Sequence, residues 1–251
     1  MDDALKQLRS LLEHSQTDGK LVEIFFRDDD VDEDEEFLRR LLRIFTSRKI
    51  PLILGVIPAR LTALATALLL EKQRDFPGLI ELTQHGWQHV NHEVSERKCE
   101  FGSSRNFAEQ LADIQRGQMR MNEVFGEQWF PAFIPPWNRC TAQTCQVLNQ
   151  LGFRVLSKLH GKLSSSPDFQ GREISVTLDI FTWKNGAMLK PAEEIFAELA
   201  NQIKHGEPLG IMLHHKVMND QSFAFLESLL IELSASSAIR FHTFQSLLKT
   251  K

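Results

Sequence analysis

Short apolar runs alternate along this chain with longer stretches in which apolar residues recur at helical spacing. The runs that predict strands are 21–26, 51–57, 79–83, 130–134, 153–157, 174–180 and 209–213. The stretches that predict helices are 33–48, 58–72, 106–125, 141–151, 191–205 and 220–234. Strands that alternate with helices are typical of βαβ units, which place parallel strands in one sheet.

About seven such units in 251 residues predict an α/β fold, a distorted parallel (β/α) barrel of about seven strands. We expect a single domain that spans residues 1–251. An open doubly wound sheet is the alternative, but no GxGxxG motif follows the first strand to indicate a dinucleotide site. The stretch 158–173 is rich in Gly and Ser and predicts a long loop.

The composition excludes several classes of partner. The net charge is −4, and Lys and Arg are scattered, so we expect no nucleic-acid partner. The longest apolar stretch, 61–70, has ten residues, too few for a membrane span. The acidic, amphipathic start of the chain does not resemble a secretory signal, and the three cysteines (Cys99, Cys140, Cys145) form no disulfide framework. We therefore expect a cytoplasmic location.

An acidic run places eight Asp or Glu residues in the nine positions 28–36. Acidic residues in the first turn of a helix oppose its dipole, so a solvated helix start explains most of the run. That reading does not cover Arg27 to Asp30, which directly follow the strand predicted over 21–26. A calcium-binding EF-hand is excluded, because Glu33 stands at the glycine position and Arg39 at the twelfth.

Four polar clusters follow predicted strands at their C-terminal ends. They are "RDDD" (27–30), "QHGWQH" (84–89), "PPWNR" (135–139) and "HHK" (214–216). In a parallel barrel all strand C-termini meet at one face, where active sites lie. The sequence therefore predicts that the four clusters line one pocket.

The spacing of His85 and His89 lets both rings reach one ion. A zinc protease of the HExxH type is excluded, because Gly86 replaces the glutamate. An isolated HxxxH is more often coincidence than a site, but a carboxylate from 27–30 would complete three ligands and leave a position open, as in catalytic zinc sites. The adjacent Asp29 and Asp30 point in different directions, so one can bind metal while the other accepts a proton.

An acid is needed on the far side of the substrate, and His214 and His215 are candidates, since imidazole titrates near neutral pH. We expect His215 to be a packed histidine without a catalytic part. His92 is a reserve metal ligand, but a surface histidine is the simpler interpretation.

Together these residues resemble the polysaccharide deacetylase family, carbohydrate esterase family four. "RDDDV" (27–31) is similar to the family's Thr-Phe-Asp-Asp-Gly motif, and "HGWQH" (85–89) matches His-(Ser/Thr)-x-x-His. "IPPWN" (134–138) partly matches Arg-Pro-Pro-Tyr, and "MLHHK" (212–216) is similar to Leu-Leu-His-Asp. "DIFTW" (179–183) is similar to the remaining motif, an Asp followed by a Trp.

The resemblance implies a distorted parallel barrel that removes N-acetyl groups from an amino sugar or glycan. One divalent ion, Zn or else Co or Ni, would be bound by Asp30, His85 and His89. Asp29 would be the base. His214 would be the acid, oriented by Asp179. The residues implied to contact the substrate are Trp137, with its backbone N–H toward the oxyanion, Pro136, Trp183 and Trp87.

One departure concerns the motif arginine that pairs with the base, because Ile134 replaces it. Arg27 and Arg139 could take its place. Arg27 lies on the same side of the strand as Asp29, but we expect it to point into the barrel below. We predict Arg139, because a side chain from another loop can approach the carboxylate head-on. Otherwise Arg139 would cap the helix that starts near Thr141 or face solvent.

Two other functions are open. A non-catalytic carbohydrate-binding relative that keeps the metal site is favoured by Ile134 and His215, but pure binding needs neither Asp29 nor His214. An amidohydrolase would carry His-x-His where 27–30 stands. A cytoplasmic deacetylase would act on a soluble amino-sugar precursor, a nucleotide- or lipid-linked sugar, or an unfinished surface polysaccharide.

Overall fold

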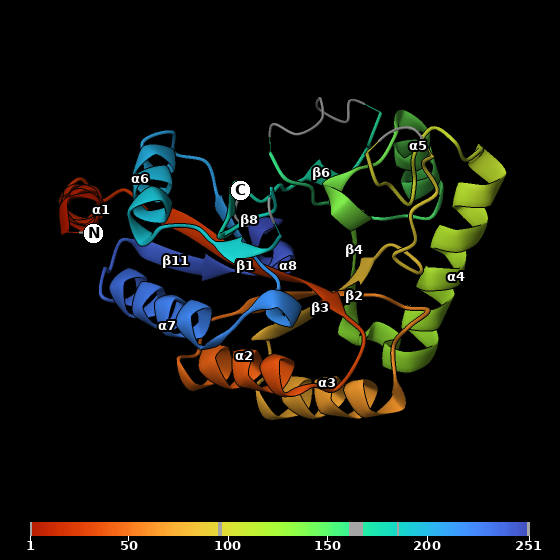
Figure 1. Cartoon of the computed structure of the whole chain (residues 1–251), viewed down its shortest axis with the longest axis horizontal. Coiled ribbons are helices and arrows are strands. Elements are labelled where there is room, and N and C mark those ends of the chain that lie inside the picture. The colour runs from red at the N-terminus through yellow and green to blue at the C-terminus, as the bar shows by residue number, and fades with distance from the viewer. Residues whose placement is uncertain (1, 95–96, 161–167, 185, 250–251) are drawn as a thin grey trace.

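A computed structural model describes residues 2–94, 97–160, 168–184 and 186–249. Its centre is a curled parallel sheet with helices packed around the outside (Figure 1). The strand order is β6-β5-β4-β3-β2-β1-β10-β7, and β11 also pairs with β1. The predicted α/β class and parallel barrel are confirmed.

Each apolar run that predicted a strand contains one. The strands of the sheet are β1 (Val22–Val31), β2 (Leu52–Val56), β3 (Ile80–His85), β4 (Trp129–Ile134), β5 (Val155–Leu156), β6 (Arg172–Glu173), β7 (Leu178–Asp179), β10 (Leu209–Leu213) and β11 (Ile239–His242). A separate antiparallel hairpin is formed by β8 (Phe181–Thr182) and β9 (Met188–Leu189). Residues 161–167 of the predicted loop 158–173 lie outside the described residues, and β6 occupies the end of that stretch.

The six predicted helices are present with slightly shifted ends. The helices are α1 (Asp2–Thr17), α2 (Glu36–Ser47), α3 (Ala63–Asp75), α4 (Phe107–Phe125), α5 (Ala142–Gln150), α6 (Ala192–Ile203), α7 (Asp220–Ser234) and α8 (Phe244–Leu247). Short 3₁₀ turns lie at η1 (Gly126–Gln128), η2 (Pro136–Asn138) and η3 (His215–Val217). None of the described helices is long and apolar enough to cross a membrane.

The two ends of the curled sheet meet along one stretch of chain, residues 172–179. At its start this stretch pairs with β5, through Val155–Arg172 and Leu156–Glu173. Farther along, Val176 N–H donates to Lys158 O and Thr177 N–H donates to Gly210 O. Its last residues, β7, then pair with β10. Backbone hydrogen bonds therefore run almost continuously around the barrel.

Side chains on the two faces of the sheet belong to different cores. Ile24 and Phe26 of β1 pack with the helices in the outer core. Phe25 points the other way and packs inside the barrel with Met212 and Phe244. Because strand side chains alternate, Arg27 and Asp29 share the inner face with Phe25. The polar residues of β1 thus lie directly above the apolar barrel interior.

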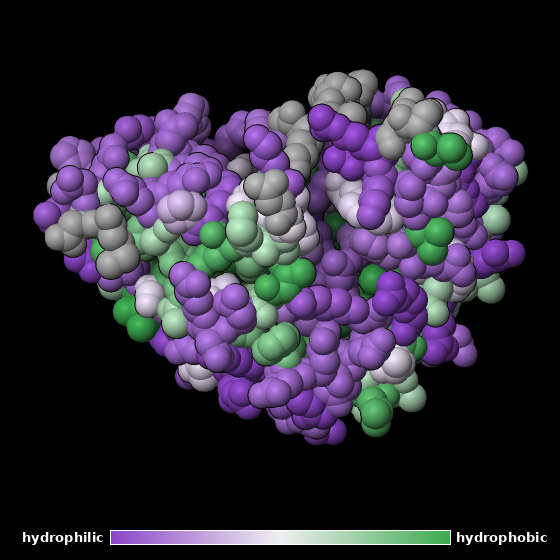
Figure 2. All heavy atoms as spheres, viewed as in Figure 1, coloured by the Kyte–Doolittle hydropathy of each residue, from purple (hydrophilic) through white to green (hydrophobic). Residues whose placement is uncertain are grey.

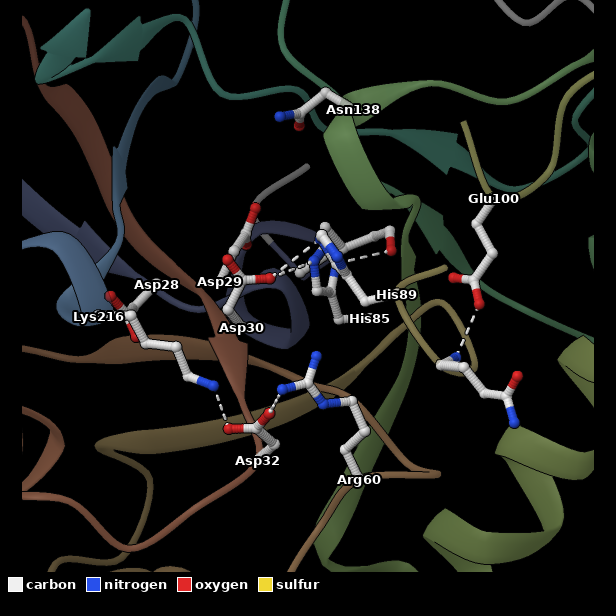
Figure 3. Close-up of polar contacts among 12 residues, drawn as sticks. Asp28, Asp29, Asp30, Asp32, Arg60, His85, His89, Glu100, Asn138 and Lys216 are labelled. Carbon is white, nitrogen blue, oxygen red and sulfur yellow. Dashed lines mark hydrogen bonds and ion pairs between the residues drawn. The ribbon is translucent and has the colours of Figure 1, made fainter. Parts of the chain in front are cut away.

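The first strand is longer than the predicted run 21–26, because it continues to Val31. Burial of Arg27, Asp28 and Asp29 is possible since each is bound to a partner within the protein. The same applies to Asp32, which is fully buried between Arg60 and Lys216 (Figure 3). The acidic run therefore lies mostly in β1 and in the connection that follows it, and only its last residues begin α2.

Candidate metal and catalytic site

A cavity of about 460 Å³ lies at the C-terminal ends of the strands, as the four polar clusters predicted. The surface in Figure 2 is hollowed between the side that carries α6 and α7 and the side that carries α4 and α5. The residues that line the cavity are Asp29, Asp30, His85, His89, Lys98, Trp137, Asn138, Arg139, Asp179, Trp183, Met212 and His214. The cavity thus brings together residues from 27–30, 84–89, 135–139 and 214–216.

Asp30, His85 and His89 form the candidate metal site. Nε2 of His85 and Nε2 of His89 each lie 3.2 Å from Oδ1 of Asp30 (Figure 3). One ligand atom from each residue lies within 4.8 Å of the other two. His92, the reserve ligand, is not in this group. The predicted triad is therefore assembled in space.

The surroundings of His85 fit metal binding. Nδ1 of His85 lies 3.0 Å from the carbonyl oxygen of Ile134, which can only accept a hydrogen bond. Nδ1 therefore donates its proton to Ile134, and Nε2 faces Asp30, where it can bind a metal once the ring is neutral. A carboxylate oxygen and two imidazole nitrogens are a donor set that suits Zn²⁺ and its neighbours in the first transition row.

The charges within the triad oppose the effect of burial. Burial disfavours the charged form of Asp30, but contact with His85 and the positive charges of His85, His89 and His214 lower the pKa of its carboxyl far below the usual range. Burial, followed by the charge of His85, lowers the pKa of His89 to about 4. Near neutral pH, Asp30 is an anion and His89 a neutral donor, which are the forms that bind a cation.

Asp29, the predicted base, is paired with Arg27 and not with Arg139. Nη2 of Arg27 donates to Oδ2 of Asp29 at 2.9 Å, and both side chains are buried. Arg139 instead donates to the carbonyl of Lys98 at 2.9 Å. The prediction of Arg139 is wrong because Arg27 can stay inside the barrel without losing its hydrogen bonds. Its Nη1 donates to Ser157, and its Nη2 also donates to Oδ1 of Asn138 at 2.6 Å.

The second oxygen of Asp29, Oδ1, lies in a different environment from the first. Oδ1 is buried and has no hydrogen-bond partner among the described residues. It lies beside Gly55, where an added Cβ would come within 3.2 Å of Oδ1 and of the Ile134 side chain. Glycine at this position leaves room for the carboxylate at the base of the cavity.

His214 lines the cavity, but Asp179 does not orient it. The carboxylate of Asp179 accepts hydrogen bonds from Phe181 N–H at 2.9 Å and from Nε1 of Trp183 at 2.7 Å. Trp183 then packs edge-on against the His214 ring at 4.9 Å between centroids. Nδ1 of His214 has no hydrogen-bond partner among the described residues. The predicted role of Asp179 is corrected, because it acts on His214 only through Trp183.

His215 is fully buried, as expected for a packed histidine. Its Nδ1 lies 2.5 Å from Asp28, and its Nε2 lies 3.0 Å from Glu35. Its backbone N–H also donates to Asp28 at 2.8 Å. These contacts attach the end of β10, and with it His214, to β1.

Two of the four predicted substrate contacts lie outside the cavity lining. Trp137 and Trp183 line it, whereas Pro136 is buried beneath Gly86 and Trp87 packs against the outer core. Gly86 has a φ of +60°, so the chain turns between His85 and Trp87. The HxxxH spacing alone could not show this turn.

Left-handed backbone concentrates at the site. Asp30, His89, Trp137 and Asn138 are four of the five non-glycine residues with positive φ among the described residues. This conformation costs roughly 1 kcal/mol or more for a residue with a Cβ and persists only where surrounding contacts impose it.

Four residues at or near the site were not predicted from the sequence: Asn138, Ser157, Lys98 and Glu100. Only Asn138 carried a hint, since it belongs to the polar cluster 135–139.

A barrel with an Asp-His-His triad, a buried Asp beside it and a further histidine in the same cavity defines the class of candidate metallohydrolases. A family model described as polysaccharide deacetylase matches residues 14–156, more than half of the chain. The chain therefore belongs to the polysaccharide deacetylase family, a family of carbohydrate esterases and deacetylases. No curated protein sequence is significantly similar to it.

Solved structures share the fold at low sequence identity. A Mycobacterium smegmatis protein assigned as a polysaccharide deacetylase has a TM-score of 0.69 at 16% identity, covering 92% of this chain and 90% of its own. A family 4 acetyl xylan esterase from Clostridium thermocellum, in complex with a cobalt ion, has a TM-score of 0.60 at 15% identity, with 90% of each chain covered. A mutant of a family 4 pseudoenzyme has a TM-score of 0.60 at 13% identity, covering 91% of this chain and 67% of its own.

Proposed function

We propose that this protein is a metal-dependent hydrolase that removes N-acetyl groups from an amino sugar or a glycan precursor. The observation that carries the proposal is the presence, in one cavity, of the Asp30-His85-His89 triad together with Asp29 and His214. A binding protein needs no proton acceptor and donor on opposite sides of its ligand, whereas hydrolysis of an amide needs both.

The triad would hold one divalent ion, Zn or else Co or Ni. When bound, such an ion supplies Lewis acidity that polarises the acetyl carbonyl. The hydrogen bond from His85 Nδ1 to Ile134 keeps that ring in one orientation. Three protein ligands leave room for the substrate, so the site has the form of a catalytic rather than a structural metal centre.

Asp29 would accept the proton of the attacking water. Arg27 binds Oδ2, so the free Oδ1 is the oxygen that takes the proton. The Arg27 ion pair keeps the carboxylate in a single orientation, which general base catalysis requires. Arg27 thus does what the family's motif arginine would do from position 134.

His214 would donate a proton to the leaving nitrogen. An amine leaves readily only when protonated, so this step matters more for an amide than for an ester. Trp183 packs against the ring and, with Trp137, forms the aromatic sides of the cavity. Aromatic faces beside a few polar groups suit a sugar ring, which has both apolar and hydroxyl-bearing surfaces.

A non-catalytic carbohydrate-binding protein is the second candidate, since Ile134 and His215 depart from the family motifs and a pseudoenzyme shares the fold. The Arg27–Asp29 ion pair weakens the argument from Ile134, because the base has its cationic partner.

The deciding experiment measures acetate release by zinc-loaded protein from N-acetyl amino sugars, chitin oligosaccharides and O-acetylated xylan. We expect release from at least one N-acetylated substrate, and loss of that release in Asp29→Asn protein that still binds zinc. Binding of a sugar without any acetate release would favour the non-catalytic candidate. Acetate release from the O-acetylated xylan alone would mean that the protein hydrolyses an ester bond and not an amide bond.

A further inference from the structure

One wall of the cavity carries positive charge. Lys98 and Arg139 both line the cavity. Arg97 precedes Lys98, and its charge acts on the Arg139 guanidinium. Burial, followed by this neighbouring charge, lowers the pKa of Arg139. Two cations therefore line the cavity and a third stands close by.

These cations lack an anionic partner within the protein. Among the described residues, no carboxylate lies within ion-pair distance of Arg97, Lys98 or Arg139. The Arg139 guanidinium makes one hydrogen bond within this part of the chain, to the carbonyl of Lys98 at 2.9 Å. A guanidinium has five N–H donors, so most of its capacity is available to a ligand.

The wall is positioned by contacts between two segments that are distant in sequence. Arg139 Nη1 donates to Lys98 O, and Cys99 Sγ donates to Arg139 O at 3.3 Å. Phe101 also forms a backbone bridge with Cys140. The segment 97–101 and the segment 139–140 are thus joined, which places both cations at the same edge of the cavity.

The acidic residues of the cavity do not neutralise this wall. Asp29 is paired with Arg27 at 2.9 Å. Asp179 accepts hydrogen bonds from Trp183 and Phe181, and Asp30 belongs to the metal triad. Each carboxylate is therefore engaged, and the charge left without a partner is positive.

We infer that the substrate carries an anionic group, a phosphate or a carboxylate, on or next to its acetylated sugar, and that Lys98 and Arg139 bind this group. The inference rests on the proposed function, since it names the substrate class of the same cavity. Arg presents a planar fork that matches phosphate and carboxylate oxygens, and Lys adds a point charge. A neutral chitin-like polymer would leave both cations without a partner.

The test compares N-acetylglucosamine with two anionic forms, N-acetylglucosamine 1-phosphate and N-acetylmuramic acid, on zinc-loaded protein. We expect kcat/KM to be at least about tenfold higher for one anionic form than for the neutral sugar, the gain typical of hydrogen bonds to charged groups. Which form is preferred distinguishes phosphate from carboxylate.

The double variant Lys98→Gln/Arg139→Gln should reduce that ratio of kcat/KM values to near one. Lys204→Gln is the matched control, because Lys204 is exposed beyond α6 and outside the cavity lining, so it should keep the ratio. Equal use of neutral and anionic sugars, or an unchanged ratio in the double variant, would overturn the inference and leave the proposed function intact.

Calorimetric binding of the same three sugars separates the two proposals. If no sugar releases acetate but an anionic one binds at least tenfold more tightly than N-acetylglucosamine, and the double variant loses this preference, the inference holds and the hydrolase proposal fails. If the three sugars neither bind nor react, both are wrong.

Discussion

The buried guanidinium of Arg27 joins β1 to two loops that border the cavity. It donates to Asp29, Asn138 and Ser157, which lie in three different segments of the chain. Removing one member of a buried ion pair leaves the other charge without a partner, which is far more costly than removing a surface charge. At the scale of single residues, Arg27 therefore contributes to stability as well as to the orientation of Asp29, the proposed base.

We expect Arg27→Gln to lower the free energy of unfolding by roughly 3–5 kcal/mol. Arg139→Gln should change it by no more than about 0.5 kcal/mol, because its side chain lies at a solvent-accessible loop. Urea denaturation of the two variants measures the difference. Equal destabilisation of the two variants would show that the buried Arg27–Asp29 ion pair contributes no more to the free energy of unfolding than a surface charge does.

A second prediction at this scale concerns Asp29 as the proposed general base. Asp29→Asn should lower kcat by about 10²–10⁴-fold, the usual contribution of a general base. Metal content should stay at that of the unaltered protein, because the ligands are intact. His89→Ala should lose both metal and activity. Loss of metal in Asp29→Asn, measured by elemental analysis, would mean that Asp29 is itself a ligand.

In the segment between β3 and α4, the buried carboxylate of Glu100 holds the loop that joins the candidate metal ligands His85 and His89. The Glu100 side chain is shown in Figure 3, and it accepts hydrogen bonds from Gln88 N–H at 2.7 Å and from Trp87 N–H at 3.2 Å. These two residues lie between His85 and His89, and Gly86 gives the carboxylate room. The conformation of this loop, and so the approach of His89 to Asp30, depends on Glu100.

We therefore expect Glu100→Gln to weaken zinc binding by about 10–100-fold, as loss of contacts behind metal ligands commonly does. Glu93→Gln is the matched control. Glu93 is also buried in this segment. Its carboxylate accepts a hydrogen bond from Ser104 N–H and none from Trp87 or Gln88. Zinc titration in the presence of a competing chelator measures both affinities. Equal losses would assign the effect to general disorder of the segment.

At the scale of the whole molecule, buried titrating groups set how stability changes with pH. Burial opposes the charge of His215, but Asp28 and Glu35 outweigh it and raise the pKa of its ring to about 9. Because the pKa of His215 is higher in the folded protein than the value of about 6.5 in the unfolded chain, protonation of His215 stabilises the fold. This stabilisation is complete below about pH 6.5 and is lost as the pH rises toward 9.

The free energy of unfolding should therefore fall between pH 6.5 and 9, by an amount on the order of 3 kcal/mol for His215. His215→Asn should be less stable at pH 6 and should show a flatter dependence over this range. Guanidinium denaturation at several pH values makes the comparison. A variant with the same slope as the unaltered protein would show that another group titrates instead.

The sequence predicted the helices and strands of the barrel well because parallel strands covered on both faces read as continuous apolar runs. It missed β11, since "IRFH" mixes polar and apolar residues and pairs only with the first half of β1. The metal triad was predictable because its spacing and strand-end position are local features. The partner of Asp29 was not, because it depends on Asn138 and Ser157, which are 111 and 130 residues from Arg27.

The position of β1 between β2 and β10 has a consequence for the order in which the candidate site forms during synthesis. Asp29, Asp30, His85 and His89 are all made within the first 89 residues, whereas β10 and His214 follow more than 100 residues later. Chains fold largely from the N-terminus as they emerge. Until β10 emerges from the ribosome, β1 has an unpaired edge, which is a site for association with other nascent chains. A ribosome-bound chain that ends near residue 160 should thus already have the candidate metal triad but neither His214 nor a closed barrel.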